Sequence, residues 1–214
     1  MELANLKQPP LNATLMGCLK GASDYFDNDL SAAMLYGLSG HAFLVNVQRV
    51  LAPNGPYVWR KERFYELLRG LGIERIGEYE LMSESGDRER ARVERELKES
   101  LDAGKLVMID FLEHQLVGGF DEQGFVVLQP WGGCTPVEIK ALTFGSFKEC
   151  LAKEGWAHFT VLGRSAARKP MAEAARDALA FAEELVPAPE ACEIDGFKIG
   201  LRAYDAGVWA CPLG

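Results

Sequence analysis

The sequence predicts an α+β fold, in which helices come first, a mostly antiparallel sheet follows, and a further helix comes after it. Three observations support this prediction. Apolar residues recur at helical spacing near the N-terminus, two apolar runs flank a short glycine-containing turn in the middle, and an alanine-rich helical pattern covers 166–186. Helices and antiparallel strands that are segregated along the chain are typical of the α+β class.

The first half of the chain is expected to form helices with extended segments between them. Pro9 and Pro10 disfavour a helix at the N-terminus, and the first helix is expected to begin at Gly17. Ser31 is expected to cap the second helix, and Gly72 to end a later amphipathic one. The predicted helices cover 17–27, 32–38, 60–71 and 85–104, and the extended segments cover 1–15, 41–51 and 73–82.

The second half of the chain predicts most of the sheet. The near-continuously apolar run 105–112 indicates a central strand, and the runs 114–121 and 124–131 indicate a hairpin around a short turn. A further strand is expected at 156–164, after a short helix that Ser146 would cap. The alanine-rich helix is expected to bury Met171, Ala175, Leu179, Ala182 and Leu185.

Composition restricts the classes of function. The 214 residues carry a net charge of −8, and the pI is about 5, so neither a nucleic acid nor a membrane surface is expected as a partner. We expect no signal peptide and no membrane span, and therefore a cytoplasmic protein. The five cysteines are scattered without a CxxC pair or a Cys/His cluster, so no metal and no cofactor is expected.

Cys18 is the best candidate for a chemical centre. At the start of a helix a cysteine feels the positive end of the helix dipole, which stabilises the thiolate, and a thiolate is a nucleophile. A neighbouring base and an orienting amide or carboxylate would complete such a site. The alternative is that Cys18 is a small buried apolar residue, the commoner environment of a free cysteine.

The spacing around Cys18 resembles that of papain-like cysteine peptidases, and especially of the bacterial peptidases that cut double-glycine leaders. The resemblance places Cys18 as the nucleophile and Asn12, six residues earlier, as a side-chain amide of the oxyanion hole. Gly119-Phe120 matches the Gly-aromatic pair on the strand that the family's histidine opens. At the position of the family's Asn-Ser-Trp-Gly motif, this chain has Gln129-Pro130-Trp131-Gly132. Gln129 would then orient the base, and Trp131 would pack over the site.

This chain departs from the family at the catalytic histidine, which in the family stands six residues before the Gly-aromatic pair. Six residues before Gly119 the chain has Glu113, and His114 follows one residue later. On an extended strand, a shift of one residue moves a side chain to the opposite face, so we expect His114 to point away from Cys18 and Glu113 to face it. A bulge would restore the register. A carboxylate that faces the thiol would raise its pKa.

A closer resemblance covers nearly the whole chain. The segments 17–43 and 113–131, together with GLRAYDA at 200–206, look like the N-terminal domain of butirosin biosynthesis protein H and its bacterial relatives. That family resembles the papain-like fold, and its named member transfers an acyl group from a carrier protein to an amine. The resemblance implies a papain-like domain at 1–165, with N-terminal helices packed on the sheet, and a shortened helical extension at 166–214.

Two functions are therefore expected to compete. One is a cysteine-dependent acyl transferase or amide hydrolase, which acts on a small-molecule or peptide substrate and has an acyl carrier protein as a candidate partner. The other is a catalytically inactive papain-like binding or scaffold domain, which Glu113 at the histidine position favours. His41 is an alternative base or a residue that lines the site, and His158 is expected to be structural. A third expectation is an interaction module that works as a homodimer through the exposed tail, 187–214.

Overall fold

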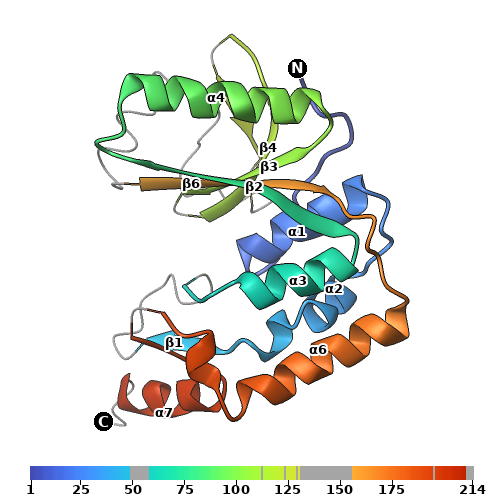
Figure 1. The fold of residues 1–214 in the computed structure, drawn as a ribbon, viewed down its shortest axis with the longest axis vertical. Helices are drawn as coiled ribbons and strands as arrows, with labels where there is room; N and C mark the ends of the chain where they lie inside the picture. The colour runs from blue at the N-terminus through green and yellow to red at the C-terminus, as the bar shows by residue number, and fades with distance from the viewer. Residues whose placement is uncertain are drawn as a thin grey trace. The chain divides into compact units, whose positions relative to one another are not determined.

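The computed structural model describes residues 1–48, 58–111, 113–122, 124–128, 130, 156–194 and 196–210. The chain forms two compact units. One comprises Met1–Leu30 and Ile73–Arg164 and is called the sheet unit here, and the other comprises Ser31–Gly72 and Ser165–Gly214 and is called the helical unit. The described residues form six α-helices, a five-stranded antiparallel sheet and a two-stranded sheet, which confirms the α+β class (Figure 1).

The sheet unit is built on the five-stranded sheet, whose strand order is β2-β6-β3-β4-β5. Every neighbouring pair is antiparallel. The strands are β2 (Ile73–Met82), β3 (Leu106–Phe111), β4 (Glu113–Phe120), β5 (Phe125–Val127) and β6 (Trp156–Arg164). The apolar strand β3 is therefore central, and β4 and β5 form the predicted hairpin.

Two helices cover opposite faces of this sheet, namely α1 (Thr14–Tyr25) and α4 (Asp87–Asp102) (Figure 1). The charged helix α4 buries Val93, Leu97 and Leu101 against β3, and these join one core cluster with Val107 and Ile109. Because side chains alternate along a strand, Met108 and Asp110 of β3 lie on the other face, toward α1.

The close approach of α1 to the sheet depends on Gly21. A β-carbon at Gly21 would lie 2.1 Å from the backbone oxygen of Lys7 and 2.8 Å from Leu116 Cδ1. Leu116 of β4 therefore points toward α1. The helix is buried over most of its surface, in agreement with its apolar composition.

The helical unit contains the remaining elements. Ser31 caps α2 as predicted, since its Oγ accepts a hydrogen bond of 3.1 Å from Met34 N. The helices are α2 (Ala32–Leu38), α3 (Glu62–Gly70), α6 (Met171–Leu185) and α7 (Leu201–Ala210), with the 3₁₀ turns η1 (His41–Phe43) and η2 (Pro189–Ala191). The strands β1 (Asn46–Gln48) and β7 (Phe197–Ile199) pair antiparallel.

Three expectations about elements are corrected. The segment expected as a strand from 41 begins with η1 and contributes only the short β1. Helix α1 begins at Thr14, three residues before the predicted start at Gly17. Its N-cap is Ala13, which has no side chain that could cap the helix, so the sequence carries no signal for this start. Helix α6 buries a different stripe, since Met171 and Leu179 are exposed. Its buried residues are Ala174, Ala178, Phe181 and Leu185.

The C-terminal segment from Ser165 shares its unit with residues 31–72. The division into domains at 1–165 and 166–214 stays a prediction, as does the papain-like identity of the fold. The helix expected after Ser146 lies outside the described residues. No described helix has the length and apolar character needed to cross a membrane.

Candidate active site

A row of ionisable residues crosses the α1 face of the sheet. The strand register places Glu80 of β2 opposite His158 of β6, His158 opposite Asp110 of β3, and Asp110 opposite His114 of β4. Directly opposed residues share a face, so the four side chains lie in one line on the face where α1 packs. The buried end of this row is the pair Asp110 and His114.

The buried His114 and the half-buried Asp110 form a close pair. His114 Nε2 lies 3.3 Å from Asp110 Oδ2, and the imidazole side chain is almost completely buried. A carboxylate at this distance can orient the imidazole ring. Such a pair can therefore serve a neighbouring thiol as a proton acceptor.

The structure corrects the expected direction of His114. His114 lies on the face of Leu116, which points toward α1, and its backbone N–H donates a hydrogen bond of 3.1 Å to Thr14 Oγ1 of that helix. The register between β4 and β5 shifts between Val117 and Gly119. The count of six residues from Gly119 back to Glu113 includes this irregularity, which interrupts the alternation of side chains between the two faces. The count therefore does not predict which of Glu113 and His114 points toward α1.

Cys18 lies on the stripe of α1 that faces β4. Thr14, four residues earlier, contacts His114, and Gly21, three residues later, approaches Leu116. Residues three or four apart share one face of a helix, so these two contacts bracket Cys18 opposite the β4 segment that begins at His114.

The Cys18 thiol is fully buried and forms no disulfide. Burial raises the pKa of the thiol well above its ordinary value, and the negative charge of Asp110 raises it further. Cys18 is therefore a neutral thiol in this structure rather than a thiolate. Because Asp110 affects the pKa of Cys18, the carboxylate and the thiol are close enough to interact electrostatically.

The helix start gives Cys18 less help than expected. Because α1 begins at Thr14, Cys18 is its fifth residue, beyond the first four N–H groups that a helix leaves without an intrahelical acceptor. The dipole effect is confined to the first turn. Asn12 is exposed and precedes the N-cap Ala13, and its expected role in an oxyanion hole stays a prediction.

Glu113 is bound at the start of α1. Thr14 Oγ1 donates a hydrogen bond of 2.6 Å to Glu113 Oε2, and the same hydroxyl accepts from His114 N. Thr14 thus ties Glu113 and His114 to the helix that carries Cys18. The carboxylate that raises the pKa of the thiol is Asp110, whereas the sequence suggested Glu113 for that effect.

His41 belongs to the helical unit and lies among aromatic rings. Its ring centroid is 5.2 Å from that of Tyr36 and 6.1 Å from those of Trp59 and Phe64. The Nε2 atom is buried without a hydrogen-bond partner among the described residues. Burial lowers the pKa of His41 to about 4, so the ring is neutral at physiological pH. Its role as an alternative base stays a prediction.

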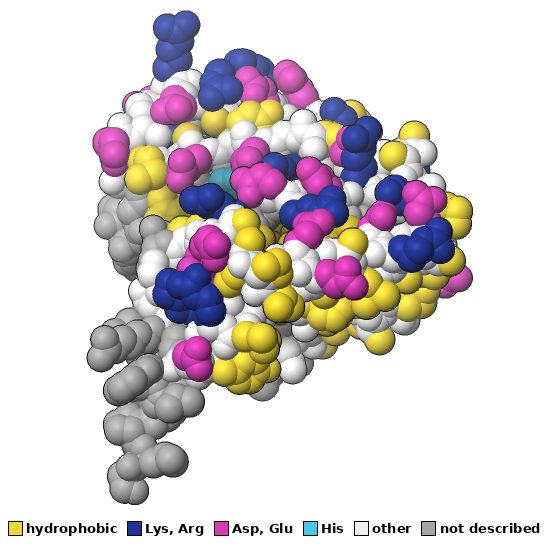
Figure 2. Space-filling model, turned by 60° about the horizontal axis from the view of Figure 1, so that its bottom comes forward, with side chains coloured by type: hydrophobic (Ala, Val, Ile, Leu, Met, Phe, Trp, Pro, Cys, Tyr) yellow, Lys and Arg dark blue, Asp and Glu magenta, His cyan; other side chains and the backbone are white. Residues whose placement is uncertain are grey.

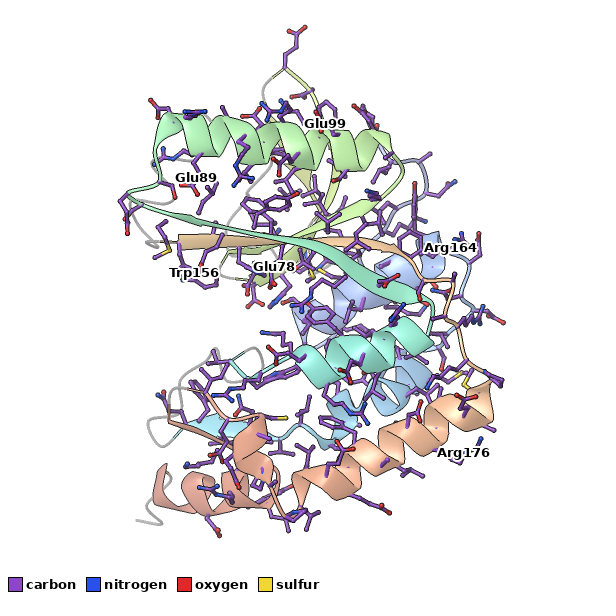
Figure 3. All side chains as sticks on the ribbon, in the orientation of Figure 1. Glu78, Glu89, Glu99, Trp156, Arg164 and Arg176 are labelled. Carbon is purple, nitrogen blue, oxygen red and sulfur yellow. The ribbon has the colours of Figure 1, made fainter. Side chains whose placement is uncertain are left out.

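The solvent-exposed end of the row has a different character. His158 Nε2 lies 2.7 Å from Glu78 Oε1, so this histidine is hydrogen bonded, and its structural role stays a prediction. Trp156 and Glu78 project from the sheet on the side away from α4 (Figure 3). Among the residues that the structure describes, no group of three or more His, Cys, Asp or Glu side chains is placed to hold a metal ion.

Two supporting residues of the predicted site, Gln129 and Trp131, lie outside the described residues. Three further residues that contact His114, namely Asp110, Thr14 and Gln8, were not predicted as supporting residues of the site. Asp110 interrupts an apolar strand and stands four residues before His114, which is a usable signal once a tight reversal between them is recognised. Thr14 and Gln8 gave no such signal, yet Gln8 accepts from Leu116 N at 2.8 Å and donates to His114 O at 2.9 Å.

The chain was also compared with known proteins. No protein-family model, no curated protein and no solved structure matches it.

Proposed function

We propose that the protein is a cysteine-dependent acyl transferase or amide hydrolase, with Cys18 as the nucleophile and His114 as the base. The observation that carries this proposal is the close Asp110–His114 pair on the sheet face where α1 holds Cys18. A thiol, an imidazole and a carboxylate on adjoining elements are the groups that nucleophilic acyl chemistry needs. The resemblance to papain-like enzymes implies the same class of reaction.

The chemistry follows from the neutral resting thiol. Cys18 Sγ attacks the acyl carbonyl carbon while its proton moves to His114, which gives a tetrahedral intermediate. The bond from the carbon to the leaving group then breaks as His114 passes the proton to that group, which departs as an amine or a thiol and leaves a thioester on Cys18. Water or an acceptor amine attacks the thioester, His114 takes the acceptor's proton, and that proton returns to Sγ as the Cys18 thiol is released. Asp110 would stabilise the imidazolium in both half-reactions.

A catalytically inactive binding domain is the second candidate, and a specific observation favours it. The thiol of Cys18 has no exposed surface, and its pKa is raised rather than lowered. A structural cysteine has this environment, whereas reactive cysteines lie in partly exposed, electropositive surroundings. The two candidates differ in whether Cys18 forms a covalent intermediate.

Intact-mass spectrometry after incubation with a short-chain acyl thioester tests the proposal. We expect one acyl group on the wild-type protein, located at Cys18 by peptide mapping, and none on Cys18→Ala. His114→Asn should slow acylation by at least about 100-fold, the scale of general-base catalysis.

Cys192 supplies the matched control, because it is also buried and free and its pKa is also raised by burial. Cys192→Ala should be acylated at the wild-type rate. Absence of an adduct at Cys18 over a range of acyl donors, in protein whose circular dichroism is native, would favour the binding domain and reject the enzyme.

A further inference from the structure

Helix α6 carries a second apolar face that the described residues do not cover. The large side chains Leu179 and Val186 are 58 % and 65 % exposed, although the helix already buries another stripe within its unit. Hydrophobic side chains gather on the face of the molecule turned forward in Figure 2. A contiguous exposed apolar face on a helix is typical of an interaction surface.

The spacing of this face is that of a coiled-coil seam. Apolar residues follow one another at intervals of three, four, three and four residues, the pattern in which one helix packs along another. The seam consists of Ala172, Ala175, Leu179, Ala182 and the C-cap residue Val186, of which Ala175 and Ala182 are half-buried and the other three exposed. Its small alanines allow close approach of a second helix, and Leu179 at its centre is the largest of the five side chains.

The charges beside the seam specify the partner. Arg176 and Glu183 are seven residues apart and therefore lie on the same flank of the seam. Within the described part of the chain neither side chain has an ion-pair partner, whereas the other acidic residues of α6 do. Those paired residues are Glu173, Asp177 and Glu184. In Figure 3, Arg176 projects outward from α6.

These two charges complement a second copy of the same helix in one orientation. In an antiparallel pair of identical helices the same flank of each meets, so Arg176 of one copy lies opposite Glu183 of the other, and the two-fold axis repeats the contact. The midpoint of the two charges falls at residues 179 and 180, which places Leu179 at the axis. A parallel pair would set this flank against Met171 and Ala178 and leave both charges unpaired.

The helix that follows in the chain, α7, also has exposed apolar side chains. Leu201 and Tyr204 of α7 are 69 % and 63 % exposed. Gly200, which immediately precedes α7, lies next to the end of α6, since a β-carbon there would be 3.8 Å from Leu185 O.

We propose that the protein forms a two-fold symmetric homodimer through the seam of α6, with the two helices antiparallel and Arg176 paired with Glu183 of the partner copy. The proposal is independent of the acyl-transfer proposal, because none of these residues belongs to the candidate site.

Sedimentation velocity of the full chain from low-micromolar to sub-millimolar concentration tests this inference. We expect a reversible monomer–dimer equilibrium. Leu179→Asp should raise the dissociation constant by about 100-fold, because both copies would bury a carboxylate at the axis. Arg176→Glu and Glu183→Arg should each weaken the dimer by about tenfold, and the double variant should regain the wild-type constant.

Arg88→Glu makes the same charge change on the exposed side of α4 and should leave the dissociation constant unaltered. Circular dichroism of each variant checks that it folds. A wild-type protein that stays monomeric over the whole range would overturn the inference. So would a dimer that Leu179→Asp does not weaken, or a double charge reversal whose effect is the sum of the single ones.

Discussion

Asp110 Oδ2 lies 3.3 Å from His114 Nε2, at the point where β3 and β4 pair. The same carboxylate raises the pKa of the Cys18 thiol. Asp110 therefore has two opposed effects on the proposed chemistry, since it would stabilise an imidazolium at His114 during the reaction, whereas its charge disfavours a thiolate at Cys18. Neutralising Asp110 separates these effects.

Asp110→Asn is expected to lower the pKa of Cys18, because the substitution removes a negative charge near the thiol. The pKa should stay above its ordinary value, because burial is its larger cause. The rate of iodoacetamide alkylation of the peptide that contains Cys18, followed against pH, measures this change. Acylation by a thioester should slow in the same variant, by about tenfold or more, because His114 loses its orienting carboxylate.

Glu113→Gln is the matched control, since it removes a carboxylate three residues away and keeps an oxygen that can accept from Thr14. It should change the pKa of the thiol less than Asp110→Asn does. If Asp110→Asn leaves the alkylation profile unmoved or shifts it to higher pH, the electrostatic link between Asp110 and Cys18 is wrong.

Gly21→Ala should destabilise the protein, because the new methyl group would meet the backbone of Lys7 at 2.1 Å. The backbone cannot rotate away as a side chain can, so α1 and the N-terminal segment at Lys7 must move apart, at a cost of about 1–3 kcal/mol. Gly37→Ala in α2 is the comparison, because its new methyl group would have nothing within 4 Å and alanine favours a helix by up to about 1 kcal/mol. Urea denaturation followed by circular dichroism should move the two midpoints in opposite directions.

Local signals predicted several elements of this fold correctly. The cap of α2 by Ser31, the end of α3 near Gly72 and the β4–β5 hairpin each depend on a few neighbouring residues, which is why the sequence could reveal them. The start of α1 failed because Ala13 offers no capping side chain. In α6 two apolar stripes compete, and only the packing of the helical unit decides which one is buried.

The candidate site was predicted in part, for a related reason. Cys18 and His114 stood out by residue type and spacing. The face on which His114 lies depends on the register of β4 with its neighbours and on the irregularity before Gly119, and register is set by non-local pairing. The partnership of Asp110 with His114 depends on the same pairing, so the sequence alone did not connect the two residues.

Thr14→Val should destabilise the contact between α1 and β4. The substitution keeps the shape of the side chain but removes the hydroxyl that donates to Glu113 and accepts from His114 N. A buried N–H left without a partner costs about 1–3 kcal/mol. Urea denaturation measures the loss, and Thr14→Ser, which keeps the hydroxyl, should retain most of the stability. Equal losses for the two variants would show that the methyl group matters and the hydrogen bonds do not.

His41 makes the stability of the protein depend on pH. Its pKa in the folded state is about 4, below the value near 6.5 of an exposed histidine. The unfolded chain therefore binds a proton at a pH where the folded protein does not. The stability is complete above pH 6.5 and is lost as the pH falls toward 4, by about 3 kcal/mol in all. The free energy of unfolding in urea, measured at several pH values across this window, should decrease steadily in the wild type. In His41→Phe, which cannot take up a proton and keeps an aromatic ring beside Tyr36 and Trp59, this component of the slope should vanish. A slope that is the same in both proteins would assign the acid sensitivity to other groups.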